Sequence, residues 1–194
     1  MATHSTDTTR IQDERWLKQY YFARAAFSVV WVALVFTIGQ HAAMIGAALL
    51  IVYPLWDAAA NYVDMSRSGG MRKNLTQAFN VFVSAAIAVA VIVVLNADTS
   101  LVLDVFGAWA VLSGLLQLAT AVRRWKRFGA QWAMILSGGQ SALAGVFFIA
   151  QAHASVPPAI IKVAGYAGVG AIYFLVSAVW LSVGQLRRKS ASAH

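Results

Sequence analysis

The chain contains no cysteine, and acidic side chains are scarce, with seven Asp and Glu among 194 residues. The absence of cysteine excludes disulfides, thiol redox chemistry and cysteine-based metal sites. The sequence also has no glycine-rich phosphate loop, no HExxH or GxSxG motif and no cluster of His, Asp and Glu ligands. Few groups remain for acid–base or nucleophilic catalysis. The sequence therefore predicts a protein that is not an enzyme, with no catalytic residue, no cofactor and no bound metal.

Charged residues of either sign are also few. They make up 11% of the chain, hydrophobic residues make up 60%, and the mean hydropathy is +0.66. A soluble domain carries roughly 25% charged residues and could not bury this much apolar surface. Apolar stretches of about 20 residues, the length that crosses a bilayer as a helix, recur along the chain. The predicted fold class is a single-domain all-α membrane protein with six transmembrane helices, at about Tyr21–Gly39, Ala42–Val63, Leu75–Leu95, Leu101–Val122, Trp132–Ala152 and Ala159–Gln185.

Fourteen of the fifteen Lys and Arg residues fall on one side of these spans. They lie before the first span, in the second–third loop, in the fourth–fifth loop and in the tail: Arg10, Arg15, Lys18, Arg24, Arg67, Arg72, Lys73, Arg123, Arg124, Lys126, Arg127, Arg187, Arg188 and Lys189. Only Lys162 is placed near the other side. Such asymmetry in short loops predicts that both termini are cytoplasmic. The net charge of +8 is explained by these loops, so we expect no nucleic-acid partner.

The chain divides into a polar segment, a membrane domain and a tail. Residues 1–20 form a cytoplasmic segment, either an interfacial helix or an extension of the first span. The membrane domain covers 21–186, with hairpins at about 21–63, 75–122 and 132–186, and residues 187–194 form a basic cytoplasmic tail. The second helix of each hairpin carries a related glycine-led stretch, and Gly46, Gly107 and Gly165 are 61 and 58 residues apart. This period predicts three hairpin repeats related in parallel.

Two kinds of stretch resemble those of a known family. One is a glycine-led helix followed by a basic loop, such as FGAWAVLSGLLQLATAV, and the other is the span QWAMILSGGQSALAGVFFI. Over about residues 22–188 the chain resembles the bacterial HdeD-type acid-resistance membrane proteins. The turns after Gly39 and Leu95 lack the proline that this family often has there. The resemblance implies a multi-pass protein of the bacterial inner membrane with a stress-related role. It implies no active site, and no functional residue can be carried over.

One acidic residue, Asp57, is placed deep within a predicted span, about six residues from its inner end. A carboxylate at the bilayer centre costs roughly 2.5–3.5 kcal/mol on insertion scales, so it needs a partner or a function. Asn61 follows at i+4 on the same helix face, and Pro54 removes a backbone donor just before it. Arg24 enters the first span from the same side at similar depth. The group is either a structural ion pair or a proton- or cation-responsive site.

Two further features involve contacts between helices. Asp104 and Lys162 begin the fourth and sixth spans near the outer surface and are predicted to form a bridge. Small residues at helical spacing mark predicted packing faces on the fourth, fifth and sixth spans, because membrane helices associate where small side chains let backbones approach. These packing residues are Gly107, Ala110, Gly114, Ser137, Ser141, Gly145, Gly165 and Gly168.

Two functional hypotheses follow from the sequence. The first is a non-enzymatic stress or acid-resistance protein that associates with membrane lipids, with anionic lipid at its cytoplasmic basic loops, and with other membrane proteins or itself. The second is a small transporter or proton-responsive channel centred on Asp57.

Overall fold

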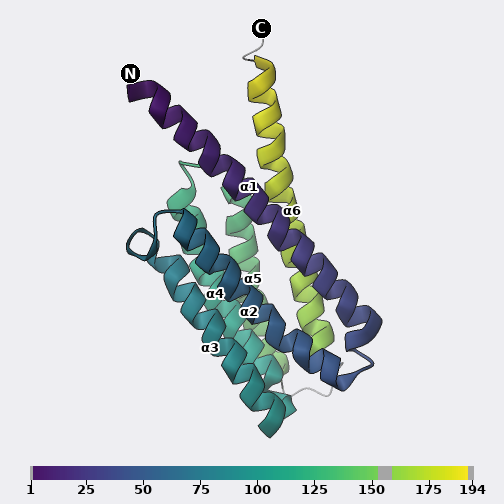
Figure 1. Ribbon diagram of the computed structural model, residues 1–194. Coiled ribbons are helices and arrows are strands. Elements are labelled where there is room, and N and C mark those ends of the chain that lie inside the picture. The colour runs from purple at the N-terminus through teal and green to yellow at the C-terminus, as the bar shows by residue number, and fades with distance from the viewer. Residues whose placement is uncertain (1, 153–158, 192–194) are drawn as a thin grey trace.

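The computed structural model describes residues 2–152 and 159–191, with side chains from residue 12 onward except those of 189 and 191. All regular structure within these ranges is helical (Figure 1). The long helices are α1 (Ala2–Leu34), α2 (Ala43–Arg67), α3 (Leu75–Ala97), α4 (Val102–Arg124), α5 (Gln131–Gln151) and α6 (Ala159–Ala191). A π-helical turn, η1 (Val35–Gly39), extends α1, and the 3₁₀ turns η2 (Met71–Lys73) and η3 (Thr99–Leu101) precede α3 and α4.

Six segments in the described chain are long and apolar enough to cross a membrane, which confirms the predicted all-α fold with six spans. The predicted boundaries agree closely for α3 and α5, whereas α2 continues to Arg67 and α6 to Ala191. Helix α1 runs without a break from the polar segment into the first span, as an extension rather than a separate interfacial helix. The final residues 192–194 of the predicted tail lie outside the described part of the chain.

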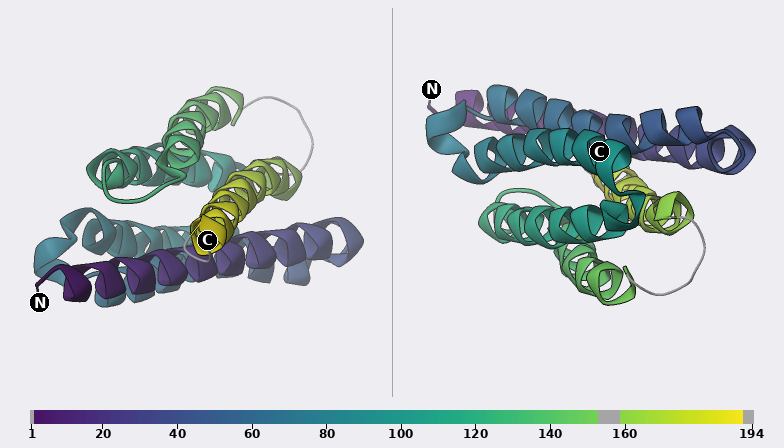
Figure 2. Two further views of the ribbon diagram at one scale, coloured as in Figure 1. Left: turned by 90° about the horizontal axis from the view of Figure 1, so that it is seen from above. Right: turned by 90° about the horizontal axis from the view of Figure 1, so that it is seen from below.

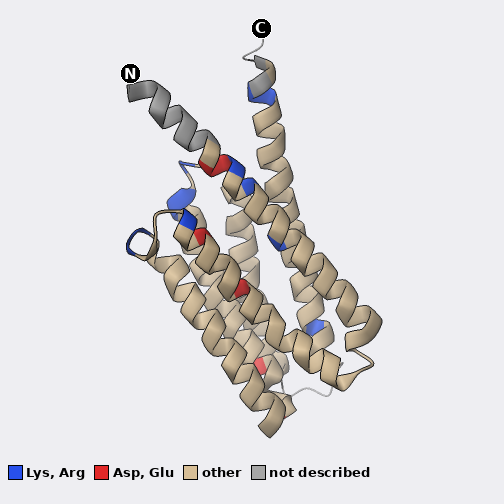
Figure 3. Cartoon of the chain, in the orientation of Figure 1, with Lys and Arg blue, Asp and Glu red and all other residues tan. Residues whose placement is uncertain are grey.

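The two ends of the bundle differ in charge (Figure 3). Most of the Lys and Arg residues lie at one end. The same end holds the N-terminus of α1, the C-terminus of α6, and the segments 68–74 and 125–130. We call this the basic end, and the opposite end, where η1 and η3 lie, the outer end. The structure thus gathers the loop charges at one end of the bundle, in the arrangement from which the membrane orientation was predicted.

Helix pairing differs from the predicted series of hairpins. The most extensive contacts join α4 to α5, α1 to α6, and α2 to α3, while α1 and α2 touch only sparsely. Seen along the bundle, α6 lies between α1 and the α4–α5 pair (Figure 2). The closest sequential pairs are therefore those joined at the basic end, and the predicted arrangement of three outward-joined hairpins is not shown by the packing.

Glycines explain why α4 and α5 form the tightest pair. A Cβ at Gly107 would lie 2.8 Å from the carbonyl oxygen of Gly145, and one at Gly114 would lie 2.7 Å from that of Gly138. Backbones this close leave no space for a side chain at the crossing. Ser141 Oγ adds a hydrogen bond to the Ala110 carbonyl across the same contact (2.9 Å). The structure places the predicted packing residues of α4 and α5 at or beside this contact, and Gly138 joins them.

The predicted packing role of Gly165 and Gly168 on α6 is wrong. A Cβ added at either position would meet no atom within 4 Å, so neither glycine permits a close helix approach. The buried face of α6 is instead a row of alanines, with Ala164, Ala167 and Ala178 fully buried. Gly165 is exposed and Gly168 is half-buried, so neither lies on the fully buried line of these alanines.

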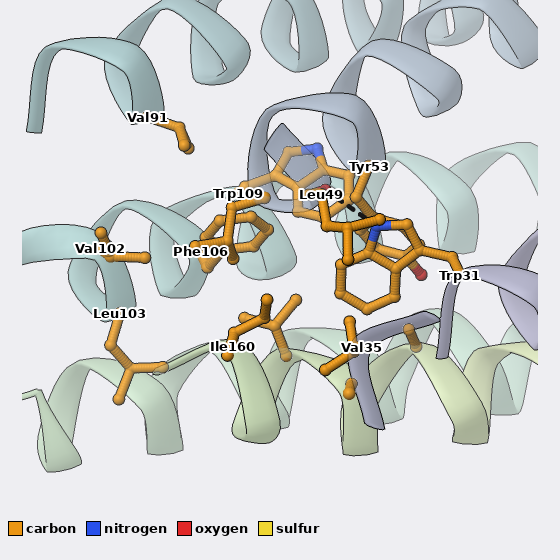
Figure 4. Close-up of a cluster of buried hydrophobic side chains, with 14 of the residues drawn as sticks. Trp31, Val35, Leu49, Tyr53, Val91, Val102, Leu103, Phe106, Trp109 and Ile160 are labelled. Carbon is orange, nitrogen blue, oxygen red and sulfur yellow. Dashed lines mark hydrogen bonds between the residues drawn. The ribbon is translucent and has the colours of Figure 1, made fainter. Parts of the chain in front are cut away.

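The outer half of the bundle interior is apolar (Figure 4). A cluster of buried side chains from η1 and all six long helices fills it, and we call it the outer hydrophobic cluster. Its largest fully buried members are Trp31, Phe106, Val35, Val91 and Val163. The Trp31 indole donates to the Leu49 carbonyl (2.8 Å), which satisfies its only polar atom. Polar side chains therefore gather in the other half, toward the basic end.

Candidate functional site

The central feature of the polar half is an ion pair between Arg24 of α1 and Asp57 of α2. Asp57 is only 6% exposed. The Arg24 guanidinium donates to Asp57 Oδ1 and to the Tyr20 hydroxyl (2.9 Å), and it stacks over the Phe174 ring of α6 at 4.5 Å. A buried carboxylate is costly without an opposite charge and further donors, and both are present here. The pair joins α1 to α2, two helices that otherwise touch little.

The second oxygen of Asp57 is bonded as well. Asp57 Oδ2 accepts from Asn61 Nδ2 (3.0 Å) and from Ser84 Oγ of α3 (2.8 Å). Ser84 Oγ in turn accepts from Trp109 Nε1 of α4 (3.0 Å). The structure thus brings the predicted residues Arg24, Asp57 and Asn61 together and adds a serine and a tryptophan. One carboxylate links four helices through charge-assisted hydrogen bonds.

Two other sequence-predicted features concern Pro54 and the outer end of the bundle. Pro54 is buried one turn before Asp57, and α2 continues through it to Arg67. The predicted outer bridge between Asp104 and Lys162 stays a prediction. Lys162 Nζ donates to Gln151 Oε1 of α5 (3.1 Å). Asp104 lies in the first turn of α4, where a carboxylate is favoured by the helix dipole.

A second buried ion pair was missed by sequence reasoning, which ended the second span at Val63, one residue before Asp64. Asp64 is 2% exposed and pairs with Arg124 at the end of α4 (2.9 Å). Its Oδ2 also accepts from Gln77 Nε2 of α3 (3.1 Å), and Arg123 donates to Gln77 Oε1 (2.8 Å). The signal was present, because Asp57, Asn61 and Asp64 stand at i, i+4 and i+7 on one helix face.

Ion pairs near the ends of α1 and α6 were also missed. Glu14 is buried and pairs with Arg188 of α6, and Lys18 Nζ donates to Gln185 Oε1 (2.9 Å). Asp13 pairs with Arg127 at the surface (3.2 Å). These contacts fix the polar start of α1 against α6 and the fourth–fifth loop.

Several hollows lie in the polar half of the described structure. The basic pocket, of about 560 Å³, is lined by residues of α1, α2 and both loops at the basic end. The inner cavity, of about 50 Å³, lies between the Asp64 and Arg24 regions, and the middle cavity, of about 40 Å³, lies beside Asp57, Trp109 and Tyr166. The apolar groove, of about 260 Å³, runs between α1 and α2 along Trp16, Ala23, Ala59 and Val63.

The hollows differ in the chemistry of their walls. In the described part of the chain, no group of three or more His, Cys, Asp or Glu side chains could hold a metal ion. The basic pocket has five cationic side chains and two carboxylates on its wall. It therefore favours an anion, whereas the inner and middle cavities present amides, hydroxyls and a neutralised ion pair.

Comparison with known proteins gives one match. Residues 82–150 match the model of a family described as a short repeat of unknown function (DUF308), the family of the HdeD-like membrane proteins. The matched stretch runs from α3 through α4 to the end of α5, and so includes the close α4–α5 pair. No curated protein and no solved structure gives a significant match. The comparison thus finds, over α3 to α5, similarity to a membrane-protein repeat whose function is unknown.

Proposed function

We propose that the protein is a non-enzymatic membrane protein of the stress or acid-resistance type that holds anionic phospholipid at its cytoplasmic face. The match to a short-repeat family of HdeD-like membrane proteins supports the type. The basic loops support a location in the bacterial inner membrane with both termini in the cytoplasm. The basic end would then meet the leaflet that carries anionic headgroups.

The basic pocket and the apolar groove together have the shape and charge of a phospholipid site. Five cations, Arg67, Lys73, Arg123, Arg124 and Arg127, and the carboxylates of Asp13 and Asp64 line the pocket, a surplus of three positive charges. The groove beside it is lined largely by apolar and small side chains, which suit an acyl chain. Trp16 lines both hollows.

Trp16 is the single observation that supports this proposal most directly. Its indole Nε1 is buried and has no hydrogen-bond acceptor among the described residues. A buried indole N–H normally has a partner. The Arg67 guanidinium lies 4.9 Å from the centre of the Trp16 ring, at the boundary between pocket and groove. A phosphate or ester oxygen of a lipid seated there would accept from Trp16 while its headgroup lies near Arg67 and Lys73.

Removing two pocket cations is expected to weaken binding of anionic lipid. A hydrogen bond to a charged group contributes about 1.5–3 kcal/mol, so Arg67→Gln/Lys73→Gln should lower affinity for phosphatidylglycerol by at least about a hundredfold. Native mass spectrometry of the purified protein titrated with phosphatidylglycerol or phosphatidylcholine measures this. Trp16→Phe, which keeps the ring and removes the donor, should lower affinity by about fivefold, the loss of one hydrogen bond.

Arg15→Gln/Arg72→Gln is the matched control, because both residues are exposed at the basic end and neither lines the pocket. It removes the same charge and should change affinity much less. Equal losses in the two double variants, or equal binding of the two lipids by the native protein, would show that no specific lipid site exists. Bound copies of the chain or co-purifying membrane proteins would appear in the same spectra as the alternative partners.

A second candidate function is a small transporter or proton-responsive channel, favoured by the burial of the Arg24–Asp57 pair beside the middle cavity. Under this hypothesis Asp57→Asn abolishes a proton flux while the protein still folds. Vesicles that enclose a pH-sensitive dye measure the flux after an acid jump. If native protein and Asp57→Asn give the same flux as empty vesicles, this function is excluded.

A further inference from the structure

Three of the hollows follow one another from the basic end into the bundle. The basic pocket and the inner cavity share Asp64 and Arg124. The inner and middle cavities share Arg24, Asn80, Gln117 and Phe174. Shared walls on this scale mean that only side chains separate neighbouring hollows. The series therefore leads from the surface of the basic end to Asp57 and Tyr166.

Polar side chains from the six long helices line this series. Asp64 and Arg124 form the boundary between the basic pocket and the inner cavity. Beyond it stand the amide of Gln117 and the Arg24–Asp57 pair, and Ser113 and Ser141 line the deepest part. A wall of this kind favours water, since an empty cavity in a protein is normally apolar.

One buried atom points to an occupant. Asn80 is 7% exposed, lines both the inner and the middle cavity, and its Oδ1 has no hydrogen-bond donor among the described residues. A buried acceptor without a partner is unfavourable, so a donor is expected there. A water needs roughly 10–15 Å³, and the two cavities, of about 50 and 40 Å³, have room for several.

The series ends at the outer hydrophobic cluster. Tyr53 and Trp109 belong both to the wall of the middle cavity and to this cluster. Beyond them the interior is filled by Trp31, Phe106 and Val163, each almost without exposed surface. The interior thus changes from polar to apolar near the level of Trp109.

We propose that the series is an aqueous half-channel that admits water and small hydrogen-bond donors from the basic end to the Arg24–Asp57 pair, with Asn80 Oδ1 as a binding position. It is closed toward the outer end by the outer hydrophobic cluster. The ion pair is then in contact with the solvent of one compartment only. This inference rests on neither proposed function, because solvent access requires neither bound lipid nor flux.

The absence of cysteine allows a direct test. Ser113→Cys and Gln117→Cys each place a single thiol on the cavity wall. The first replaces only the serine oxygen by sulfur. Silver ion, which is close to water in size, replaces the thiol proton to form a silver thiolate. Leu115→Cys is the matched control, two residues away on the lipid-facing surface of α4, and Val91→Cys reports the fully buried cluster.

The proteins are reconstituted in phosphatidylcholine vesicles, silver nitrate is added to one side, and unblocked thiol is labelled with a fluorescent maleimide after denaturation. Arg72→Cys and Asn96→Cys, exposed at the basic and outer ends, mark the two sides. We expect Ser113→Cys and Gln117→Cys to be blocked at least about tenfold faster than either control, because only a hydrated, ionised thiol reacts. Blocking should occur only from the Arg72 side.

Equal rates at Ser113, Gln117 and Leu115 would overturn the half-channel, and so would blocking from the Asn96 side. Tryptophan-monitored melting verifies that each variant is folded before labelling. Phosphatidylcholine carries no net charge, so the result does not depend on anionic lipid, and failure of the lipid proposal would leave this outcome unchanged.

Discussion

Arg24→Met is expected to be among the most destabilising single substitutions in the protein. It removes the positive charge that faces Asp57 and leaves a carboxylate that is 6% exposed without its counter-ion. Breaking a buried pair by removing one partner costs about 3–5 kcal/mol. The melting temperature in mild detergent, followed by tryptophan emission, measures the loss.

The double variant Arg24→Met/Asp57→Asn separates this mechanism from simple loss of packing. An asparagine at 57 carries no charge, and its oxygen can still accept from Asn61 and Ser84. We therefore expect the double variant to recover at least half of the stability that Arg24→Met loses. A double variant that melts at or below the temperature of Arg24→Met would contradict the assignment of the loss to an uncompensated charge.

The surface pair Arg127–Asp13 supplies the control. Its side chains are 70% and 35% exposed, and its N···O distance is 3.2 Å. Exposed pairs contribute about 0–1 kcal/mol, so Arg127→Met should shift the melting temperature little. The contrast isolates burial, because the two substitutions remove the same group from the same kind of pair.

The sequence was sufficient to predict the number of helices and to give an Arg24–Asp57 ion pair as one of two interpretations, since both depend on depth in the membrane. Span length follows from bilayer thickness, and two opposite charges at similar depth in successive spans are natural partners. Asp64 was missed because it stands close to the predicted end of its span, where a carboxylate needs no partner. The structure extends α2 past it to Arg67 and buries it.

Helix pairing could not be obtained from the same information. Small residues show that a helix face permits close approach, but they do not identify the helix that makes it. Gly165 and Gly168 were assigned to a packing face in the same way as Gly107 and Gly114, yet only the latter two meet another backbone. The close partner of α4 is α5 because Gly138 and Gly145 complement its glycines at matching heights.

The position of the polar groups also has a physical reason. The Arg24–Asp57 and Asp64–Arg124 pairs lie in the half of the bundle nearer the basic end. The outer half of the interior is filled by the outer hydrophobic cluster, whose aromatic and branched side chains offer a buried charge no partner. A half-channel open to the basic end follows from the same division of the interior.

Substitution of the α4–α5 glycines is the second change with a large expected effect. A Cβ at Gly145 would collide with the Gly107 carbonyl oxygen and would lie 2.7 Å from the backbone nitrogen of Val111. Backbone atoms cannot turn away as a side chain can, so the helices must separate. Overpacking of this kind costs about 1–3 kcal/mol, and we expect Gly145→Ala to lower the free energy of unfolding by that amount. Unfolding in mixed micelles with increasing SDS measures it.

Gly165→Ala is the opposite case, because nothing opposes the added methyl group. Its Cβ would meet no atom within 4 Å, so only the backbone preference remains. Alanine is favoured over glycine in a helix by about 0.8–1.0 kcal/mol, and this variant should therefore be neutral or slightly stabilised. If Gly145→Ala were as stable as Gly165→Ala, the close backbone contact between α4 and α5 would be disproved. The close pairing of α4 with α5, in place of the predicted pairing of α4 with α3, would be disproved with it. The fit of these glycines is what holds α4 and α5 closer than any other pair.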